Sequence, residues 1–236
     1  SRIEQLIGKV EEEKRLRKAA KEETEKIMQA ALNKVFDKVK ENYEWCKLKT
    51  VAKVVGGHTP KRSIKKYWNG DIPWLTPAEL PSDTITIVAD TKEKITHEGL
   101  KNSSAILLPP GTVLYTTRAT IGKIATTGVS LTTNQGFTNF ICTKHLYNWY
   151  LAYCLKWLTP KIEEEAGKTT FKEVKRSKMK EIKIPVPPLD EQKKIVNYMK
   201  QIEDQLRSIK EIQQKTEEEL EMLVPTILDR AFKGKL

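Results

Sequence analysis

The feature that constrains this chain most is a long apolar stripe near its C-terminus, introduced by prolines. Pro185, Pro187 and Pro188 keep the backbone extended, because each ring fixes φ and restricts the preceding residue. We expect a helix to begin there, with Asp190 as its N-cap and Glu191 in the first turn, where the helix dipole favours negative charge. Apolar residues then recur at steps of four and three, and the predicted coiled-coil positions are Ile195, Met199, Ile202, Leu206, Ile209, Leu220 and Leu223.

So narrow a stripe needs a partner helix rather than a broad core. A helix from Asp190 to Val224 would be a rod of roughly 50 Å at 1.5 Å per residue. Only Gln213 and Thr216 break the stripe. Pro225 is expected to kink or interrupt the rod, and residues 231–234 are expected to form its last turn.

The segment from Ile3 to about Glu41 predicts a second long helix. It contains no proline and is rich in Glu, Lys, Arg and Ala. Its apolar stripe is weaker and consists of Leu6, Val10, Leu16, Ala20, Ile27, Ala31, Val35 and Val39. Two rods of similar length on either side of one domain favour an antiparallel hairpin. The alternative is two separate amphipathic helices packed on a globular body.

Beyond Leu48 the composition changes to β-branched runs separated by turn residues, which is typical of short strands. Strands are predicted at 50–55, 85–88, 105–108, 112–116, 121–126 and 137–142, and a helix at 148–158. Turns are predicted at 56–60, 68–71, 109–111 and 133–136. The predicted fold class is α+β: one mixed α/β domain at 45–188, flanked by long helices at 1–44 and 189–236 that pair as an antiparallel coiled coil.

The positive charge is concentrated in the middle of the chain. The formal net charge is +11, and residues 45–184 hold 22 Lys and Arg against 11 Asp and Glu, whereas the flanking segments are balanced. Such a segment can simply be soluble. A basic domain between neutral helices nevertheless favours a polyanion partner, and duplex DNA is the one we expect.

Three basic segments supply candidate DNA-binding residues. Basic loops with aromatics suit phosphates and a groove edge, and an arginine at a strand end suits guanine. For each segment a solvated surface loop is equally consistent, and Trp68 and Trp74 are expected to pack within the loops rather than stack on bases. The candidates are Lys61, Arg62, Lys65, Lys66, Tyr67 and Asn69; Thr117, Arg118 and Thr120; and Lys168, Thr169 and Lys172.

The sequence shows no convincing catalytic or cofactor-binding motif. Gly56-Gly57 lacks the rest of a phosphate loop, and no cofactor loop or base pocket of an adenine methyltransferase is present. Asp83 with Asp90 and Lys92 imitates a nuclease pattern, but so short a match arises by chance. The 3 cysteines and 3 histidines have no metal-binding spacing, and neither a membrane span nor a signal peptide is visible. We therefore expect a cytoplasmic protein without a catalytic or metal site.

Several short motifs follow one another along residues 45–236. They are Gly56-Gly-His-Thr-Pro60, Tyr67-Trp-Asn-Gly-Asp-Ile-Pro-Trp-Leu-Thr76, Pro110-Gly-Thr-Val-Leu114, Ile121-Gly-Lys123, Asn134-Gln-Gly136, Ile184-Pro-Val-Pro-Pro-Leu-Asp-Glu-Gln192 and the tail from Ile227 to Leu236. Each motif alone is weak, but in this order and spacing the chain resembles the specificity subunit of type I restriction–modification systems.

The resemblance implies a non-catalytic subunit that reads one half of a bipartite DNA target. Such subunits carry two target recognition domains separated by conserved helices, and they dock methyltransferase subunits and, through them, restriction subunits. S-adenosylmethionine, ATP and Mg²⁺ would then reside on the partners only. This chain has one such domain, which resembles either the second half of a subunit or a short half-subunit, and a homodimer through the helices is a further expectation. The alternatives are a self-contained DNA-cleaving enzyme and a structural coiled-coil protein.

Overall fold

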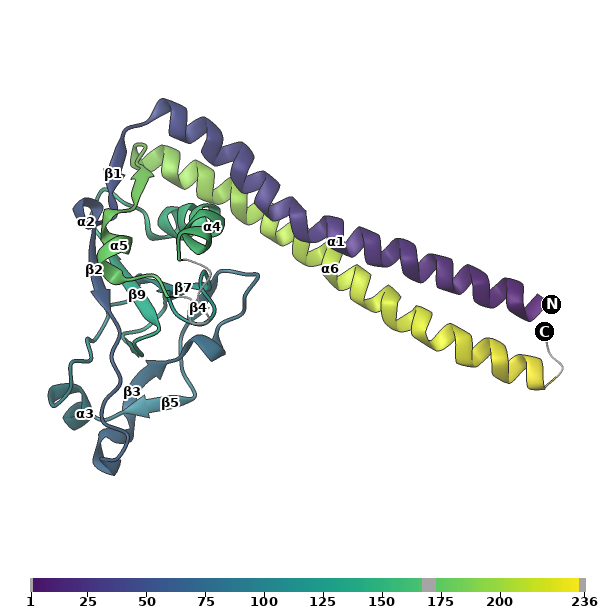
Figure 1. Ribbon diagram of the computed structural model, residues 1–236, viewed down its shortest axis with the longest axis horizontal. Helices are drawn as coiled ribbons and strands as arrows, with labels where there is room; N and C mark the ends of the chain where they lie inside the picture. The colour runs from purple at the N-terminus through teal and green to yellow at the C-terminus, as the bar shows by residue number, and fades with distance from the viewer. Residues whose placement is uncertain (1, 167–172, 234–236) are drawn as a thin grey trace. The chain divides into compact units, whose positions relative to one another are not determined.

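The computed structural model describes residues 2–166 and 173–233, which form two compact units. The helical unit lies within residues 1–33 and 197–236, and the central unit comprises residues 34–196. Each unit contains part of the two long helices, α1 (Arg2–Asn42) and α6 (Leu189–Phe232) (Figure 1). The predicted boundaries at 44 and 188 therefore differ from those of the units. The reason is packing: Phe36 at the end of α1 stacks on Trp157 of the central unit.

In the helical unit, α1 and α6 lie side by side and run antiparallel (Figure 1). Arg17 donates to Thr216 at 2.6 Å, and Gln213 donates to Thr24 at 2.9 Å, so rising numbers on one helix meet falling numbers on the other. Lys21 and Glu217 form an ion pair at 3.1 Å between these two contacts. The predicted antiparallel pair is confirmed.

The seam of this pair is narrower than the predicted stripe. Met199, Leu206 and Leu220 are buried and Ile202 is half-buried, whereas Ile209 and Leu223 are 39% and 43% exposed. On α1, Leu16, Ala20 and Ile27 are likewise exposed. The partner helix therefore covers the row Met199, Leu206 and Leu220 more completely than the second row of the stripe. Ile195 is buried, but it belongs to the central unit.

The structure corrects the predicted start of α6 and the predicted interruption at Pro225. The helix begins at Leu189, and the N–H groups of Glu191 and Gln192 both donate to the Pro188 carbonyl at 3.0 Å, so Asp190 lies inside the first turn instead of capping it. Pro225 does not interrupt α6, which continues to Phe232. A proline removes one backbone hydrogen bond, and here the Thr226 hydroxyl donates to the neighbouring Met222 carbonyl at 2.7 Å.

The central unit is built on three sheets. The larger two have the strand orders β2-β9-β6-β7-β4 and β5-β3-β8, and the third pairs β1 with β10. Among the strand pairs of the described residues, β4–β7 and β3–β8 are parallel and the others antiparallel. The strands are β1 Trp45–Lys47, β2 Ala52–Gly56, β3 Trp68–Leu75, β4 Thr86–Val88, β5 Glu93–Ile95, β6 Val113–Thr116, β7 Ile124–Thr127, β8 Thr132–Thr133, β9 Phe137–Cys142 and β10 Lys183–Pro185.

Further helices complete the unit: α2 Leu48–Val51, α3 His97–Lys101, α4 Asn148–Glu165, α5 Arg176–Glu181, and the 3₁₀ turns η1 Lys65–Tyr67 and η2 Pro77–Glu79. The long helix α4 packs on β6 and β7. The main core contains Leu114 and Phe137 of the five-stranded sheet and Leu75 at the end of β3, and a smaller one forms around Ile72, Trp74 and Ile95.

Most predicted strands are observed within a few residues; one predicted strand and one predicted turn are wrong. Residues 105–108 form only an isolated bridge between Leu108 and Leu131, because Pro109 and Pro110 stop the ladder there. Residues 68–71, predicted as a turn, begin β3, which shifts register against β5 between Trp68 and Ile72. The α+β class with two long helices is confirmed.

Candidate nucleic-acid interface

Four segments of the central unit meet at one edge of the five-stranded sheet. Gly56 at the end of β2 pairs with Thr138, and Thr116 at the end of β6 pairs with Phe137, so residues 57–60, 117–120 and 134–136 leave the sheet together. Residues 173–176 join them, because the Val174 N–H donates to the Thr117 carbonyl at 2.9 Å. We call these four segments the loop edge.

Backbone contacts hold the loop edge together. The His58 N–H donates to the Thr133 carbonyl at 2.8 Å, and the Thr59 hydroxyl donates to the side-chain oxygen of Gln135. Gly57 permits this approach, since a Cβ there would lie 1.8 Å from the Asn134 carbonyl oxygen. The Trp74 indole N–H donates to the His58 carbonyl at 3.0 Å and ties the loop edge to β3. The glycine-rich motif is therefore architectural.

The outer surface of the loop edge is polar and basic. Arg118, Thr120, Gln135, Lys175 and Arg176 are exposed, and His58 and Thr59 are half-buried. Burial first, and then the nearby Arg176 charge, lower the pKa of His58, which keeps the imidazole neutral at pH 7. Arginine, glutamine and threonine are side chains that read base edges.

Sequence reasoning identified only part of this surface. Arg118 and Thr120 were predicted and are exposed on it. Thr117 was also predicted but is 4% exposed, and its hydroxyl donates to the Gly136 carbonyl, so it braces the loop instead of facing a ligand. Gln135 and Arg176 were not predicted. Gln135 lies in the motif Asn134-Gln-Gly136, and Arg176 follows Lys175 in a basic pair, so both signals were visible in the sequence.

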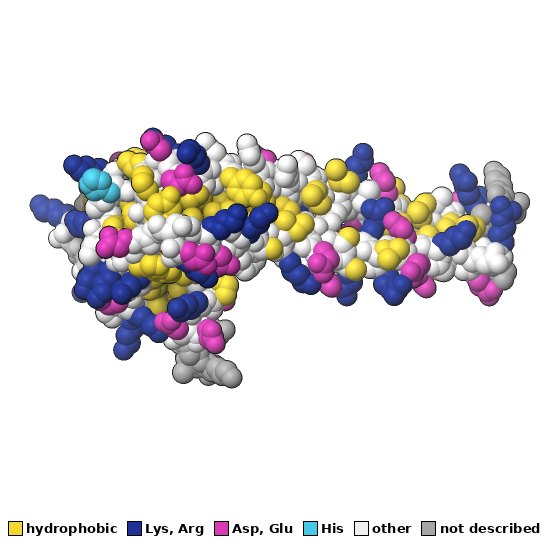
Figure 2. Space-filling view, turned by 90° about the horizontal axis from the view of Figure 1, so that it is seen from above, with side chains coloured by type: hydrophobic (Ala, Val, Ile, Leu, Met, Phe, Trp, Pro, Cys, Tyr) yellow, Lys and Arg dark blue, Asp and Glu magenta, His cyan; other side chains and the backbone are white. Residues whose placement is uncertain are grey.

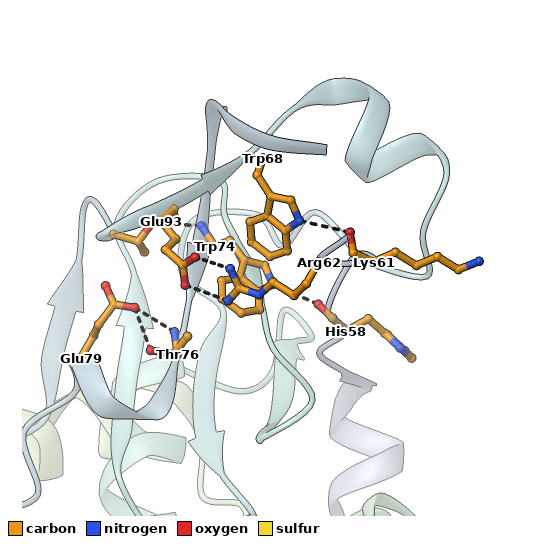
Figure 3. Close-up of polar contacts among 9 residues, drawn as sticks. His58, Lys61, Arg62, Trp68, Trp74, Thr76, Glu79 and Glu93 are labelled. Carbon is orange, nitrogen blue, oxygen red and sulfur yellow. Dashed lines mark hydrogen bonds and ion pairs between the residues drawn. The ribbon is translucent and has the colours of Figure 1, made fainter. Parts of the chain in front are cut away.

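The basic loop that follows Pro60 is partly committed to its own packing. The Arg62 guanidinium lies 3.9 Å from the Trp68 ring centroid and 4.7 Å from that of Trp74, and it also forms a fork with both carboxylate oxygens of Glu93 (Figure 3). The hydrogen bond from Arg62 lowers the pKa of Glu93. Arg62 therefore has a structural role in holding the loop, and its contact with DNA stays a prediction.

The two tryptophans pack as expected. Their rings meet edge to face with centroids 5.0 Å apart, and Trp74 is 2% exposed. Trp68 donates to the Lys61 carbonyl at 3.3 Å, while the Lys61 side chain points away from the rings (Figure 3).

The remaining basic-loop candidates differ in how far their side chains are available. Lys61, Lys65, Lys66 and Asn69 are exposed, and Lys66 forms an ion pair with Glu98. Tyr67 is half-buried beside Gly99, where a Cβ would come within 2.6 Å of the Tyr67 carbonyl. The predicted residues Lys168, Thr169 and Lys172 lie outside the described residues.

The charge pattern separates the two units. Figure 2 shows Lys and Arg side chains gathered on the central unit, whereas both signs alternate along the helical unit. In the described part of the chain, no group of three or more His, Cys, Asp or Glu side chains is placed to hold a metal ion. None of the helices described there is long and apolar enough to cross a membrane.

A family model described as type I restriction modification DNA specificity domain matches residues 40–218. This match covers most of the chain. The chain belongs to this family. The resemblance inferred from its motifs is confirmed.

Relatives of this specificity-domain chain cover most of it. The MjaIX specificity subunit of Methanocaldococcus jannaschii is 37% identical over 175 residues, which are 73% of this chain and 40% of the relative. The EcoR124I/EcoR124II specificity subunit of Escherichia coli is 29% identical over 175 residues, covering 71% and 43%.

Two solved structures match the whole chain. A structure from a study titled "Structural basis underlying complex assembly and conformational transition of the type I R-M system" has a TM-score of 0.84 at 28% identity, covering 100% of this chain and 58% of that one. The HsdS subunit from Thermoanaerobacter tengcongensis has a TM-score of 0.66 at 29% identity, covering 100% and 57%. The chain thus spans well under two thirds of the length of these relatives.

Proposed function

We propose that this chain is a DNA-reading subunit of a type I restriction–modification system. The central unit would bind duplex DNA and read one half of a bipartite target. The observation that carries this proposal is the loop edge, where strand-end loops held by backbone bonds present Arg118, Thr120, Gln135 and Arg176 outward from a basic unit.

The basic loop and the loop edge of the central unit would contact different parts of the DNA. The exposed lysines Lys61 and Lys65 of the basic loop suit phosphates, which position a protein on DNA without reading sequence. The arginine and glutamine side chains of the loop edge suit base edges, because they can make paired hydrogen bonds to guanine and adenine.

The helical unit would serve as a scaffold for partners. It is charge-balanced along its length, and its pairing leaves apolar side chains such as Ile212 and Met222 exposed at 64% and 70%. Methyltransferase subunits would dock on the helices and bring S-adenosylmethionine, and restriction subunits with ATP and Mg²⁺ would join through them. In this scheme the chain itself performs no chemistry and works in the cytoplasm.

Two such units would read a two-part target. Half-sites read by a dimer lie one helical turn or more apart, about 34–36 Å, so a single central unit reads one of them. If two copies associate through their helices, the assembly is isologous, and the preferred site is an inverted repeat with an unread spacer.

Selection of bound duplexes from a random library, with methyltransferase subunit present, tests the proposal. We expect enrichment of a defined half-site, repeated in inverted orientation. An enriched site of two unlike halves would contradict the homodimer but not DNA reading. A pool that stays random after repeated rounds would overturn the proposal itself.

A further inference from the structure

Arg118 and Glu173 face each other at the loop edge. Their backbones form an isolated antiparallel bridge, which places both side chains on the same face. The Nε and Nη2 atoms of Arg118 both lie 2.8 Å from one carboxylate oxygen, Oε1 of Glu173. Both side chains are nearly half exposed, at 47% and 43%.

This pair is open, unlike the other arginine–glutamate pair of the central unit. Arg62 engages both oxygens of Glu93 and covers its own face with Trp68. Arg118 engages only Oε1 of Glu173, and within residues 2–166 and 173–233 the Nη1 group and the second oxygen, Oε2, have no hydrogen-bond partner. Among the described residues, the Arg118–Glu173 pair therefore presents an unused donor beside an unused acceptor.

The loop that carries Arg118 is held in an uncommon conformation. Ala119, the next residue, has φ of +60°, a region that residues other than glycine seldom adopt. The Thr116 hydroxyl donates to the Thr120 carbonyl at 2.5 Å, and the Gly122 N–H donates to the Thr116 carbonyl at 3.0 Å, which closes the loop around this residue. Strain of this kind is concentrated at sites where a side chain must be presented in one direction.

The donor and acceptor match one base pair. In the major groove, guanine offers the acceptors O6 and N7, and its partner cytosine offers the N4 amino group as a donor beside them. We propose that Arg118 and Glu173 read a G·C pair together, with Arg118 donating to guanine and Oε2 of Glu173 accepting from cytosine N4. This inference rests on the proposed DNA-reading function and deepens it.

A surface ion pair without a reading role is the alternative, and exposed pairs of this kind contribute little to stability. The two roles differ in what a carboxylate does near DNA. As a plain counter-ion, Glu173 would only repel phosphates, and its removal would strengthen binding to every sequence alike. As a reader, it would contribute to preference at a single position of the target.

The experiment uses the full chain with methyltransferase subunit and the half-site enriched from a random library. Arg118→Ala, Glu173→Ala and the control Lys65→Ala are compared on duplexes that vary one base pair at a time. We expect Arg118→Ala to lose about 5- to 150-fold of preference at one G·C position. Glu173→Ala should lose part of the preference at that same position, and Lys65→Ala should weaken all duplexes equally.

A guanine analogue supplies an independent readout. Replacing that guanine by 7-deazaguanine removes the N7 acceptor, so wild type should bind more weakly, whereas Arg118→Ala should not respond. Equal preference in wild type and Arg118→Ala would overturn the inference while leaving DNA reading intact. Uniformly tighter binding by Glu173→Ala would reduce Glu173 to a counter-ion and also overturn it. A wild-type chain that selects no sequence would instead refute the proposed function.

Discussion

The side-chain oxygen of Gln192 accepts a hydrogen bond from the Tyr147 backbone N–H at 2.7 Å, across 45 residues of sequence. The amide nitrogen of Gln192 donates to the His145 and Pro187 carbonyls at 2.9 and 2.7 Å, and the residue is fully buried. The first turns of α6 are therefore part of the central unit, because one buried side chain satisfies three backbone groups there.

Replacing Gln192 by alanine should destabilise the central unit by about 2–4 kcal/mol, because the three backbone groups would be left buried and unpaired. Chemical denaturation monitored by tryptophan fluorescence measures this loss. The matched control is Gln201→Ala, an exposed glutamine on the same helix, which should change stability by less than about 0.5 kcal/mol. Equal effects of the two substitutions would contradict the role of Gln192.

The helical unit should gain stability when Gln213, a polar residue between the two helices, is replaced by an apolar one. Gln213 donates to Thr24 at 2.9 Å, but its own side-chain oxygen is buried without a partner among the described residues. Thr24 keeps its bond to the Ala20 carbonyl at 2.8 Å, so Gln213→Leu should stabilise the pair by about 1 kcal/mol. Thermal unfolding of this variant beside Gln214→Leu, on the exposed face, measures the difference. A clear loss of stability in Gln213→Leu would show that the polar contact between Gln213 and Thr24 is needed for folding.

The Arg62–Glu93 pair should stabilise the central unit less at acidic pH. The hydrogen bond from Arg62 lowers the pKa of Glu93 below its ordinary 4.5, so the carboxylate contributes stability above that pH and loses it as the pH falls through the lowered value. Free energies of unfolding from urea denaturation at about pH 6 and pH 3.5 should therefore differ less in Glu93→Gln than in wild type, by up to about 1 kcal/mol for so exposed a pair. The same pH dependence in both proteins would rule out this pair as its source.

The isolated chain should leave DNA chemically unchanged. Incubation with labelled S-adenosylmethionine, or with Mg²⁺ and plasmid, is expected to yield neither methylated nor cut DNA, because the chemistry is assigned to partner subunits. Turnover that co-purifies with the chain and is lost on Arg118→Ala would support the enzyme alternative.

Periodicity predicted the large elements well. The helices α1 and α6 were predicted from apolar spacing, their antiparallel pairing was favoured by their similar length on either side of one domain, and β9 was predicted with its observed bounds, 137–142. Predictions from local sequence patterns were wrong where packing against a neighbouring element determines which residues are buried. Ile209 fits the stripe but is 39% exposed, because the partner helix covers its row less completely than the row that contains Leu206.

The candidate site was harder to predict, because its parts are far apart in the sequence. Arg62 looks like a phosphate contact until Glu93, 31 residues away, is seen to hold it. Gln135 and Arg176 join the loop edge only through the pairing of β2, β6 and β9 and the bridge at Glu173. Composition located the basic unit, but long-range pairing determines which of its side chains face outward.

The most direct test of DNA binding by the central unit is its dependence on salt. Dissociation constants of the full chain for a duplex are measured at about 50 and 200 mM salt, beside Lys61→Glu/Lys65→Glu in the central unit and Lys9→Glu in the helical unit. With about five phosphates neutralised, counterion release predicts binding several hundred-fold weaker at the higher salt. The double variant should bind more weakly and show a smaller salt slope, and Lys9→Glu should follow wild type. A dissociation constant that is the same at both salt concentrations would contradict the account.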